Sequence, residues 1–415
     1  MIRNYLLTAW KVLLRRKAFT FISLFGITLT LTILLVCSTV LDNTLFPQGP
    51  QRTSSNFLQV QRVKTVSADK NSTWRSGPGF KFLSLNVARL ASPEKISFFS
   101  MNERGTSFLA GQKLINTIKR TDAIYWEILD FDFIEGRVFS KSEFERGAMV
   151  CVINKSTKGE FFKDGQAMGQ RLVVNNQSFE VIGVVEDVPF FEDVAFADIW
   201  VPYTSSASTQ YRENFMGGWA ALLYHPNPKM LQDIKEEYAQ ILKDDLKTTD
   251  PERFAVCYST ADSMLERIAR TFSGSMDEES GIGLLFTMLA LLALGFMVLP
   301  SINLINLNIS RILERSSEIG IRKAFGASSR ELVFQFLVEN LLITTLGGLL
   351  GLLFSWLILF QIDQSGLIPG FQYHISLHVL LYGLGLVFVF GVVSGVYPAY
   401  RMSKLHPVNA LKGSV

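Results

Sequence analysis

The sequence predicts a membrane protein of four transmembrane α-helices, with a large α+β domain inserted between the first and second helix. Hydrophobic residues make up 48% of the 415 residues, which is more than a soluble protein usually contains. This excess is concentrated in four long runs without Lys, Arg, Asp or Glu. Basic residues gather in alternate connections between the runs, and this asymmetry indicates how the helices are oriented.

Each of the four uncharged runs is long enough to cross a bilayer. A bilayer core requires about 20 apolar helical residues, and the runs cover residues 18–41, 281–310, 340–362 and 364–400. Buried helices of a soluble protein are the alternative, but uncharged runs beyond about 18 residues are typical of membrane helices. The first run is longer than the roughly 7–15 apolar residues of a signal peptide, so we expect it to be retained. The predicted transmembrane helices are 18–42, 281–308, 332–360 and 376–399.

The short connections determine the predicted orientation. Five basic residues lie in 1–17, five in 309–331 and three in the tail 400–415, whereas the short loop 361–375 has none. Basic short loops stay in the cytoplasm, so both termini and residues 309–331 are predicted to be cytoplasmic. The insert 43–280 and the loop 361–375 then face the other side of the membrane.

The insert 43–280 is long enough to form a core of its own, and we expect two subdomains. It carries 27 basic and 31 acidic residues, so no nucleic-acid surface is expected. Residues 171–174 and 178–185 are rich in β-forming side chains and flank Asn175-Asn176, which predicts a β-hairpin.

The end of the insert combines helical and extended patterns. Apolar residues at helical spacing predict a helix over 230–242, and residues 253–258 predict a strand. Residues 262–280 have a polar helical pattern, which we expect to continue into the second transmembrane helix as a stalk. These elements make the insert a mixed domain.

Two further features concern the membrane itself. Residues 1–17 have the pattern of an amphipathic helix that lies in the lipid interface. Gly347 and Gly351 form a G-x-x-x-G pattern in the third transmembrane helix, and the fourth contains four glycines. Such small faces allow helices to approach closely. Because four helices cannot easily enclose a wide pore, we expect a dimer or close packing with a partner.

The basic connection 309–331 has the local signals of an ordered helical knob. We expect a short helix over 311–325 that ends at Gly326, since glycine is favoured just after a helix. Ser328 and Glu331 have the spacing of a capping box, so a second helix should begin at residue 329. A passive connector with ordinary caps is the alternative.

No motif for bond-making chemistry is evident. The sequence lacks the phosphate-binding pattern G-x-x-x-x-G-K-S/T and the zinc pattern H-E-x-x-H. His374 and His378 have no third ligand nearby, so no metal site is expected. Cys151 and Cys257 both lie in the insert, and the sequence leaves open whether they pair or remain thiols. We therefore predict a transport or mechanical component with no catalytic residue and no cofactor on this chain.

Residues 314–327 (ERSSEIGIRKAFGA) closely resemble the coupling segment of MacB/FtsX-type ABC transporter permeases. In that family the segment lies between the second and third of four transmembrane helices. Residues 394–401 (SGVYPAYR) and 407–411 (PVNAL) resemble the end of the same proteins. Within the insert, residues 131–139 (FDFIEGRVF) and 183–187 (GVVED) resemble the MacB-like periplasmic core domain.

The resemblance implies a permease of the bacterial inner membrane, with the insert in the periplasm. MacB has an ATPase on the same chain and this sequence does not, so a separate ABC ATPase subunit is expected to bind ATP and Mg²⁺. Two permease copies, identical or closely related, would work with it. ATP-driven closure of the ATPases would move the coupling segment and, through the helices, the periplasmic domain (mechanotransmission). The residues expected to dock on the ATPase are Glu314, Arg315, Glu318, Ile319, Gly320, Arg322, Lys323, Gly326 and Ala327.

The resemblance favours the export of peptides, drugs or similar compounds from the periplasm. MacB relatives often work with a periplasmic adaptor and a TolC-like outer-membrane duct, and the sequence does not reveal whether this chain does. One alternative is an FtsX-like regulator of cell-wall hydrolases. Another is a lipoprotein-releasing permease that resembles LolC and LolE, and an unrelated membrane sensor is a third. The substrate does not follow from the sequence.

Overall fold

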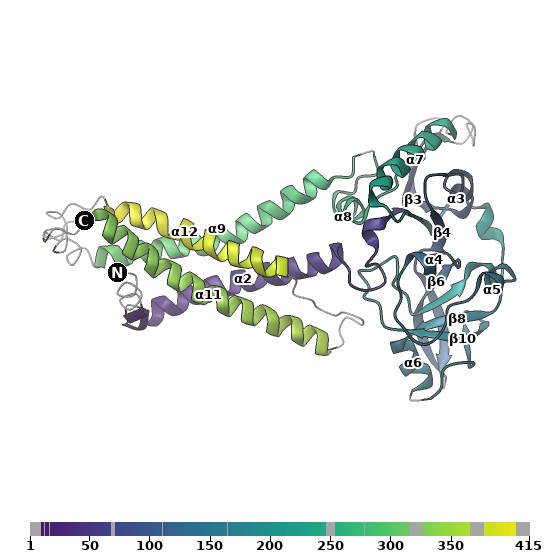
Figure 1. Ribbon diagram of the computed structural model, residues 1–415, viewed down its shortest axis with the longest axis horizontal. Helices are drawn as coiled ribbons and strands as arrows, with labels where there is room; N and C mark the ends of the chain where they lie inside the picture. Colours follow the sequence, from purple (N-terminus) through teal and green to yellow (C-terminus); the bar gives the residue numbers. More distant parts are fainter. Residues whose placement is uncertain are drawn as a thin grey trace. The chain divides into compact units, whose positions relative to one another are not determined.

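The computed structural model describes residues 10, 11, 13–15, 17–67, 71–109, 111–163, 165–245, 254–277, 279–314, 321, 325, 328–365 and 377–403. The chain divides into two compact units (Figure 1). We call the first the helical unit, comprising Met1–Asp42, Thr287–Ser365 and Tyr373–Val415. The second, the sheet unit, comprises Asn43–Phe286 and Gly366–Gln372.

Four long helices coincide with the four uncharged runs of the sequence. They are α2 (Lys17–Leu45), α9 (Ile282–Glu314), α11 (Ser329–Ser365) and α12 (Leu377–Ser403). Within the described residues, Thr20–Leu45 and Val333–Ser365 are long and apolar enough to cross a membrane, whereas the apolar stretches Ile282–Phe296 and Leu380–Val389 are shorter. The number of spans therefore stays a prediction. Most of the amphipathic helix expected over 1–17, most of the loop 361–375 and the end of the tail lie outside the described residues.

The G-x-x-x-G pattern of α11 is used for packing within the chain. A Cβ atom on Gly347 would lie 2.7 Å from Cγ2 of Ile27 in α2, so only glycine allows this approach. The hydroxyl groups of Thr28 and Thr32 donate hydrogen bonds over 3.3 Å to the carbonyl oxygens of Gly347 and Gly351, respectively. The small face that we expected to permit close helix contacts thus brings α11 against α2.

A second close contact joins α11 and α12. The side-chain amide of Asn340 donates a hydrogen bond to the carbonyl oxygen of Gly391 over 2.6 Å. Gly348 faces Val387, whose Cγ2 atom would lie 2.6 Å from an added Cβ. Polar side chains that bond a neighbouring helix in this way hold helices together in an apolar environment.

Ten strands form the larger sheet of the sheet unit. The hydrogen-bonded order is β1-β13-β4-β6-β11-β8-β10-β9-β5, with β7 paired to β10. The long strand β6 also pairs with β5, so six of the strands close on themselves. Buried apolar side chains such as Ile118, Cys151 and Val181 fill the space between them. The bounds are β1 Phe57–Val60, β4 Lys95–Ser100, β5 Glu103–Leu109, β6 Gln112–Thr121, β7 Phe133–Gly136, β8 Val150–Asn154, β9 Arg171–Val174, β10 Gln177–Val185, β11 Ile199–Pro202 and β13 Trp219–Tyr224.

The predicted hairpin at Asn175-Asn176 is confirmed. Strands β9 and β10 pair antiparallel on either side of these two residues, whose φ angles are 49° and 61°. Two successive positive φ angles define the tight hairpin turn that asparagine tolerates better than most residues. The side-chain oxygen of Asn175 also accepts the backbone N–H of Thr106 over 2.8 Å, which ties the turn to β5.

A smaller antiparallel sheet has the order β12-β3-β2-β14. Its core includes Phe82 and Leu83 of one helix and Ile234 and Tyr238 of another, so two helices pack on this sheet. The helix predicted over 230–242 and the strand predicted over 253–258 are both confirmed. The bounds are β12 Met216–Gly217, β3 Thr73–Pro78, β2 Val63–Ser67, β14 Phe254–Ser259, α3 Phe80–Asn86 and α7 Leu231–Asp245.

The prediction that residues 262–280 continue into the second long helix as a helical stalk is wrong. A helix, α8 (Met264–Ser273), begins with a capping box formed by Ser263 and Glu266, but Gly274 ends it with a left-handed φ of 67°. Glycine adopts this conformation without a steric cost and so terminates the helix. The described residues that follow, 274–277 and 279–281, contain no helix, and α9 begins at Ile282.

The remaining elements are short, and the cysteines are free. Cys151 on β8 and Cys257 on β14 are buried thiols rather than a pair, and Cys37 lies on α2. The short elements are α4 Tyr125–Ile128, α5 Lys141–Glu145, α6 Lys155–Phe162, and the 3-10 helices η1 Ser54–Asn56, η2 Tyr203–Ser205, η3 Gln210–Glu213 and η4 Pro228–Met230.

Replacing Asn176 by valine should destabilise the hairpin. A β-branched residue in the left-handed region costs about 1–2 kcal/mol, so the purified full-length chain should melt at a lower temperature. The matched control Asn176→Gly should melt at or above the wild-type temperature. Thermal melting followed by circular dichroism checks this, and equal melting of the two variants would contradict the turn geometry.

Candidate functional site

One of the nine predicted coupling residues lies within the described part of the chain. Glu314 is the last residue of α9, and the other eight (Arg315, Glu318, Ile319, Gly320, Arg322, Lys323, Gly326 and Ala327) lie outside the described residues. Their docking role stays a prediction. Within 315–327, the structure describes Ile321 and Phe325. The backbone N–H of Phe325 donates to the carbonyl oxygen of Ile321 over 3.0 Å, and Phe325 is 89% exposed.

The capping box at the start of α11 is confirmed. The Glu331 carboxylate accepts the N–H of Ser328 over 3.1 Å, and the Ser328 hydroxyl accepts the N–H of Glu331 over 3.3 Å. These reciprocal bonds satisfy N–H groups that a helix start would otherwise leave unpaired. Helix α11 therefore has a defined beginning directly after the predicted coupling residues.

The structure also reveals a site that the sequence did not indicate. It consists of the two segments that join the sheet unit to the long helices, and of one loop that contacts the first segment and the helix α8 that precedes the second. We call residues 46–53, which follow α2, the N-terminal connector, and residues 274–281, which precede α9, the C-terminal connector. Residues 186–198, between β10 and β11, form the junction loop.

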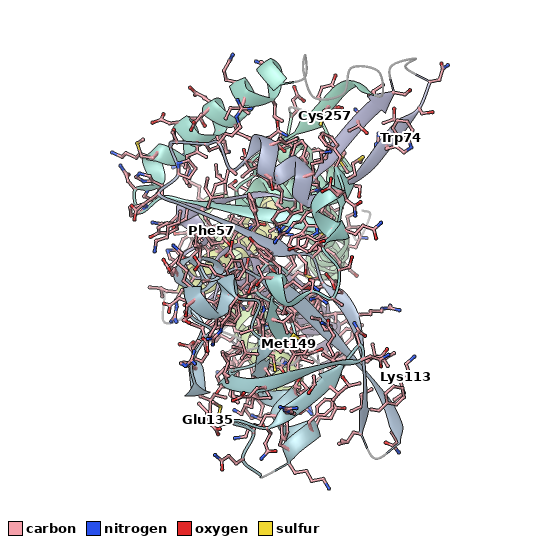
Figure 2. The ribbon with its side chains drawn as sticks, turned by 90° about the vertical axis from the view of Figure 1, so that its right-hand side faces the viewer. Phe57, Trp74, Lys113, Glu135, Met149 and Cys257 are labelled. Atoms are coloured by element: carbon pink, nitrogen blue, oxygen red, sulfur yellow. The ribbon has the colours of Figure 1, made fainter. Side chains whose placement is uncertain are left out.

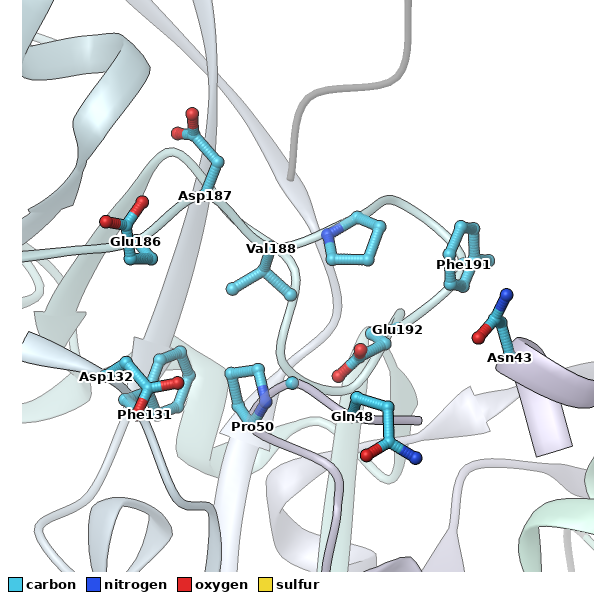
Figure 3. A pocket seen from close by; sticks show the side chains of 12 residues that line it. Asn43, Gln48, Pro50, Phe131, Asp132, Glu186, Asp187, Val188, Phe191 and Glu192 are labelled. Atoms are coloured by element: carbon cyan, nitrogen blue, oxygen red, sulfur yellow. The ribbon is translucent and has the colours of Figure 1, made fainter. Parts of the chain in front are cut away.

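Glu192 of the junction loop holds the N-terminal connector. Its carboxylate accepts the backbone N–H of Gln51 over 3.2 Å. A Cβ atom added to Gly49 would lie 2.7 Å from Glu192 Oε1, so the connector can approach this closely only with glycine there. Figure 3 shows the carboxyl group of Glu192 lying between Pro50 and Gln48.

The environment of Glu192 makes it sensitive to pH. Its side chain is only 3% exposed. Burial raises the pKa of Glu192 to about 7, and the backbone N–H groups of Gln51 and Gly49 and the charge of Arg52 oppose the rise. The carboxyl group therefore changes its charge near neutral pH. A small pocket of about 90 Å³ adjoins it, lined also by Asn43, Asp132, Glu186 and Asp187.

Further contacts fix the N-terminal connector to the rest of the sheet unit. The carbonyl oxygen of Pro50 accepts the N–H of Asp130 over 3.0 Å, and the Thr53 hydroxyl donates to the carbonyl of Ile128 over 3.0 Å. Arg52 forms ion pairs with Asp130 at 2.8 Å and Asp132 at 3.1 Å. Both of these pairs are exposed, so they contribute little to stability.

The junction loop is itself held by side chains of the core. The buried ammonium group of Lys119 on β6 donates to the carbonyl oxygens of Asp193 and Val194, each over 2.6 Å. The Tyr125 hydroxyl also donates to the carbonyl of Val194, over 2.8 Å, and the Trp200 indole N–H donates to the carbonyl of Ala195 over 3.2 Å. Burial lowers the pKa of Lys119 to about 7.

Asp193, the residue after Glu192, contacts a helix that lies close to the C-terminal end of the segment Asn43–Phe286. Its carboxylate pairs with Arg267 of α8 at 2.9 Å. Adjacent residues of one loop therefore bind the segment that enters the sheet unit and the helix that leads out of it. Lys119 in turn bonds this loop to β6 of the larger sheet.

Arg270 folds the C-terminal connector back onto α8. It forms a buried ion pair with Asp262 at 2.9 Å, in which the two side chains are 3% and 9% exposed. The same guanidinium group donates to the carbonyl oxygens of Asp277 over 2.6 Å and Glu279 over 3.2 Å. Lys64 of β2 pairs with Asp277 at 2.6 Å. The connector is thus bonded to both α8 and the smaller sheet.

The site is built from hydrogen bonds and ion pairs between backbone segments and side chains. Within the described ranges, no group of three His, Cys, Asp or Glu side chains is arranged to hold a metal ion. Of the acidic groups beside Glu192, Asp132 pairs with Arg52, Glu186 pairs with Lys155, and Asp187 accepts hydrogen bonds from Ser156. What the site can do is hold the two connectors in a fixed relation to the sheets.

Two protein-family models match the chain. The MacB-like periplasmic core domain matches residues 20–227, and the FtsX-like permease C-terminal region matches residues 282–407. Among curated proteins, the macrolide export ATP-binding/permease protein MacB of Vibrio parahaemolyticus is 23% identical over 84% of this chain and 49% of its own length. The uncharacterized ABC transporter permease YknZ of Bacillus subtilis is 26% identical over 69% of this chain and 68% of its own.

The chain spans between 49% and 59% of the length of the first curated relatives it matches. Among solved structures, the periplasmic region of MacB from Actinobacillus actinomycetemcomitans is similar over 54% of this chain and 94% of that chain. The sequence identity is 14% and the TM-score is 0.38.

Substituting Glu192 by glutamine should flatten the pH dependence of stability. A carboxyl group whose pKa is raised in the folded state stabilises fully below its unfolded pKa, near 4.5, and this stability is lost as the pH rises through 7. Between pH 4.5 and 8, the free energy of unfolding of the wild-type chain should therefore fall by on the order of 3 kcal/mol more than that of Glu192→Gln. Thermal melting of both chains across this range provides the difference, and parallel curves would contradict the assignment.

Substituting Arg270 by methionine should destabilise the chain strongly. The change leaves the carboxylate of Asp262 buried without its charged partner, at a cost of about 3–5 kcal/mol. The matched control Lys64→Met removes a pair whose aspartate is 66% exposed, so it should cost less than about 1 kcal/mol. Denaturant unfolding of the full-length chain compares the two. Equal effects would show that the Arg270 pair is not the one that holds the connector.

Proposed function

This chain belongs to the MacB/FtsX family of ABC transporter permeases, and we propose that it converts the stroke of a partner ATPase into movement of its large α+β domain. In this proposal α2, α9, α11 and α12 span the inner membrane, both termini are cytoplasmic, and residues 43–280 are an insert in the periplasm. ATP and Mg²⁺ bind to a separate ABC ATPase subunit. The movement drives the export of peptides, drugs or similar compounds.

The observation that carries the proposal is the bonding of one loop both to the N-terminal connector and to α8. Glu192 binds the backbone after α2, and Asp193 binds α8, which leads towards α9. A lever needs a stiff connection between input and output, and a flexible linker at either place would dissipate the movement. Because Lys119 bonds this loop to β6, displacement of a connector is transmitted to the larger sheet.

The cytoplasmic input is the coupling segment 309–331. Its matching motif supports docking of the ATPase on Glu314, Arg315, Glu318, Ile319, Gly320, Arg322, Lys323, Gly326 and Ala327. The capping box at Ser328 supports a defined start of α11 directly after these residues. The exposed Phe325 side chain is a further surface for a partner, because a large apolar group in solvent favours burial.

Dimerisation with a second permease copy belongs to the same proposal. Two of the relatives are named as combined ATP-binding and permease proteins, which supports a permease that works together with an ATPase. An adaptor and an outer-membrane duct would extend the path for the exported compound. The experiment below tests the coupling alone and does not depend on these partners.

Reversing the charge of Glu318 should uncouple the complex. In nanodiscs that contain the permease and its co-purified ATPase, Glu318→Lys should reduce ATP turnover or separate it from transport, because a charge at the docking surface is inverted. The matched control Lys113→Glu reverses an exposed charge at the tip of the β5–β6 hairpin and should behave as wild type. Unchanged coupling in Glu318→Lys would overturn the proposal.

A further inference from the structure

Four aromatic side chains of the sheet unit project into solvent outside the long helices. Among the described residues there, Phe46, Phe108, Phe190 and Phe272 are the aromatic residues that are more than half exposed, at 66%, 66%, 59% and 66%. Phe46 begins the N-terminal connector, Phe190 lies in the junction loop, and Phe272 lies in the last turn of α8. Single exposed apolar residues are ordinary, but a group of them at one place marks a contact surface.

The junction loop lies beside the last turn of α2. Phe191 and Asn43 line the same small pocket, and Figure 3 shows the two side chains next to each other. Asn43 belongs to the last turn of α2, inside the apolar stretch Thr20–Leu45. The exposed ring of Phe190 stands 5.7 Å from the ring of Phe191. Phe190 therefore lies at the level where the apolar part of α2 ends.

The end of α8 lies beside the start of α9. A Cβ atom added to Gly281 would lie 2.5 Å from the hydroxyl oxygen of Ser273 and 2.7 Å from its Cβ, so these two residues are in contact. Gly281 directly precedes the apolar stretch Ile282–Phe296 of α9. Phe272 is the neighbour of Ser273 in the chain. Phe272 therefore lies at the level where the apolar part of α9 begins.

The three phenylalanines are thus placed at the two ends of one insert. Phe46 directly follows the apolar stretch of α2, and its carbonyl oxygen accepts the side-chain amide of Gln48 over 3.3 Å. Because the same insert connects α2 to α9, both of its ends lie on one side of the membrane when these helices cross it. Phe46, Phe190 and Phe272 would then stand at the surface of the same leaflet.

The surface that these side chains continue is apolar. On α2, Phe21, Phe25 and Leu29 are exposed, as is expected of a helix face in contact with lipid. Apolar side chains at the end of such a face insert about 5–10 Å into the boundary between headgroups and acyl chains. Four of the twelve described residues that line the pocket behind Phe191 are acidic. This surface is therefore suited to apolar burial and not to the attraction of anionic headgroups.

We propose that Phe46, Phe190 and Phe272 insert into the bilayer at the boundary between headgroups and acyl chains, so that the sheet unit contacts the membrane surface. The partner is the lipid itself, without selection for its charge. The inference goes beyond the proposed function and rests on it only for the crossing of the membrane by α2 and α9. Phe190 precedes Glu192 by two residues, so the loop that binds the N-terminal connector is also the loop that contacts lipid.

Nitroxide labels on the full-length chain in phosphatidylcholine nanodiscs test the proposal. The label is attached to cysteine in three variants that also carry Cys37→Ala, namely Phe46→Cys, Phe190→Cys and Phe272→Cys. Cys151 and Cys257 are buried thiols and should stay unlabelled, which Cys37→Ala alone checks. Electron paramagnetic resonance then compares collisions of the label with oxygen, which concentrates among acyl chains, and with a water-soluble nickel chelate.

Phe108→Cys, in the same Cys37→Ala chain, is the matched control. Phe108 is as exposed as Phe46 and Phe272, but it pairs with Lys113 on the β5–β6 hairpin, and Figure 2 shows Lys113 at the edge of the sheet unit. We expect the ratio of oxygen to nickel collisions to be several-fold higher at positions 46, 190 and 272 than at position 108. Adding anionic phosphatidylglycerol should leave these ratios unchanged.

Three outcomes would overturn the proposal. A ratio at position 190 or 272 equal to that at position 108 would place the side chain in water. Protection from both oxygen and nickel would place it against protein, such as a second copy of the chain. A high ratio that requires phosphatidylglycerol would assign the contact to headgroup charge instead of apolar burial.

The native Cys37 separates this inference from the proposed function. Cys37 is exposed on α2, eight residues before Leu45 and so about 12 Å from it along the helix. The wild-type chain, labelled there, should give a higher ratio than any of the three phenylalanine positions. A ratio typical of water at Cys37 would overturn the proposed membrane crossing. A ratio typical of lipid at Cys37, with ratios typical of water at positions 190 and 272, would overturn the lipid contact alone.

Discussion

The structure of the sheet unit depends on the bonding of one loop to its core. Lys119 is fully buried, and its ammonium group is satisfied by two carbonyl oxygens of the junction loop. A buried ammonium without partners would be costly, so this contact fixes the loop as much as it satisfies the lysine. Glu192 can hold the N-terminal connector, and Asp193 can pair with Arg267 of α8, because the loop that carries them is held in place.

The helical unit is held together by glycine contacts and by hydrogen bonds from Thr and Asn side chains. In an apolar environment the hydrophobic effect does not drive helices together, so close packing and hydrogen bonds must do so. Glycines of α11 let α2 and α12 approach, and Thr28, Thr32 and Asn340 bond to backbone carbonyls that this approach brings within reach. Helix α11 therefore packs closely against both α2 and α12.

The sequence predicted features that depend on local patterns. The uncharged runs, the turn at Asn175-Asn176 and the cap at Ser328 each depend on a few neighbouring residues, and helices or turns occur where they were expected. The stalk was wrong because Gly274 outweighs the polar helical pattern around it. Glu192 gave no signal, since an acidic residue in a loop usually faces solvent. Its burial depends on contacts with residues about 140 positions earlier in the chain.

The backbone pairing of Gln59 with Asp262 has an architectural consequence. It closes about two hundred intervening residues into a loop whose ends meet side by side. A segment with adjoining ends requires of its host only two neighbouring attachment points. Evolution could therefore exchange or remodel this segment while leaving the four long helices unaltered.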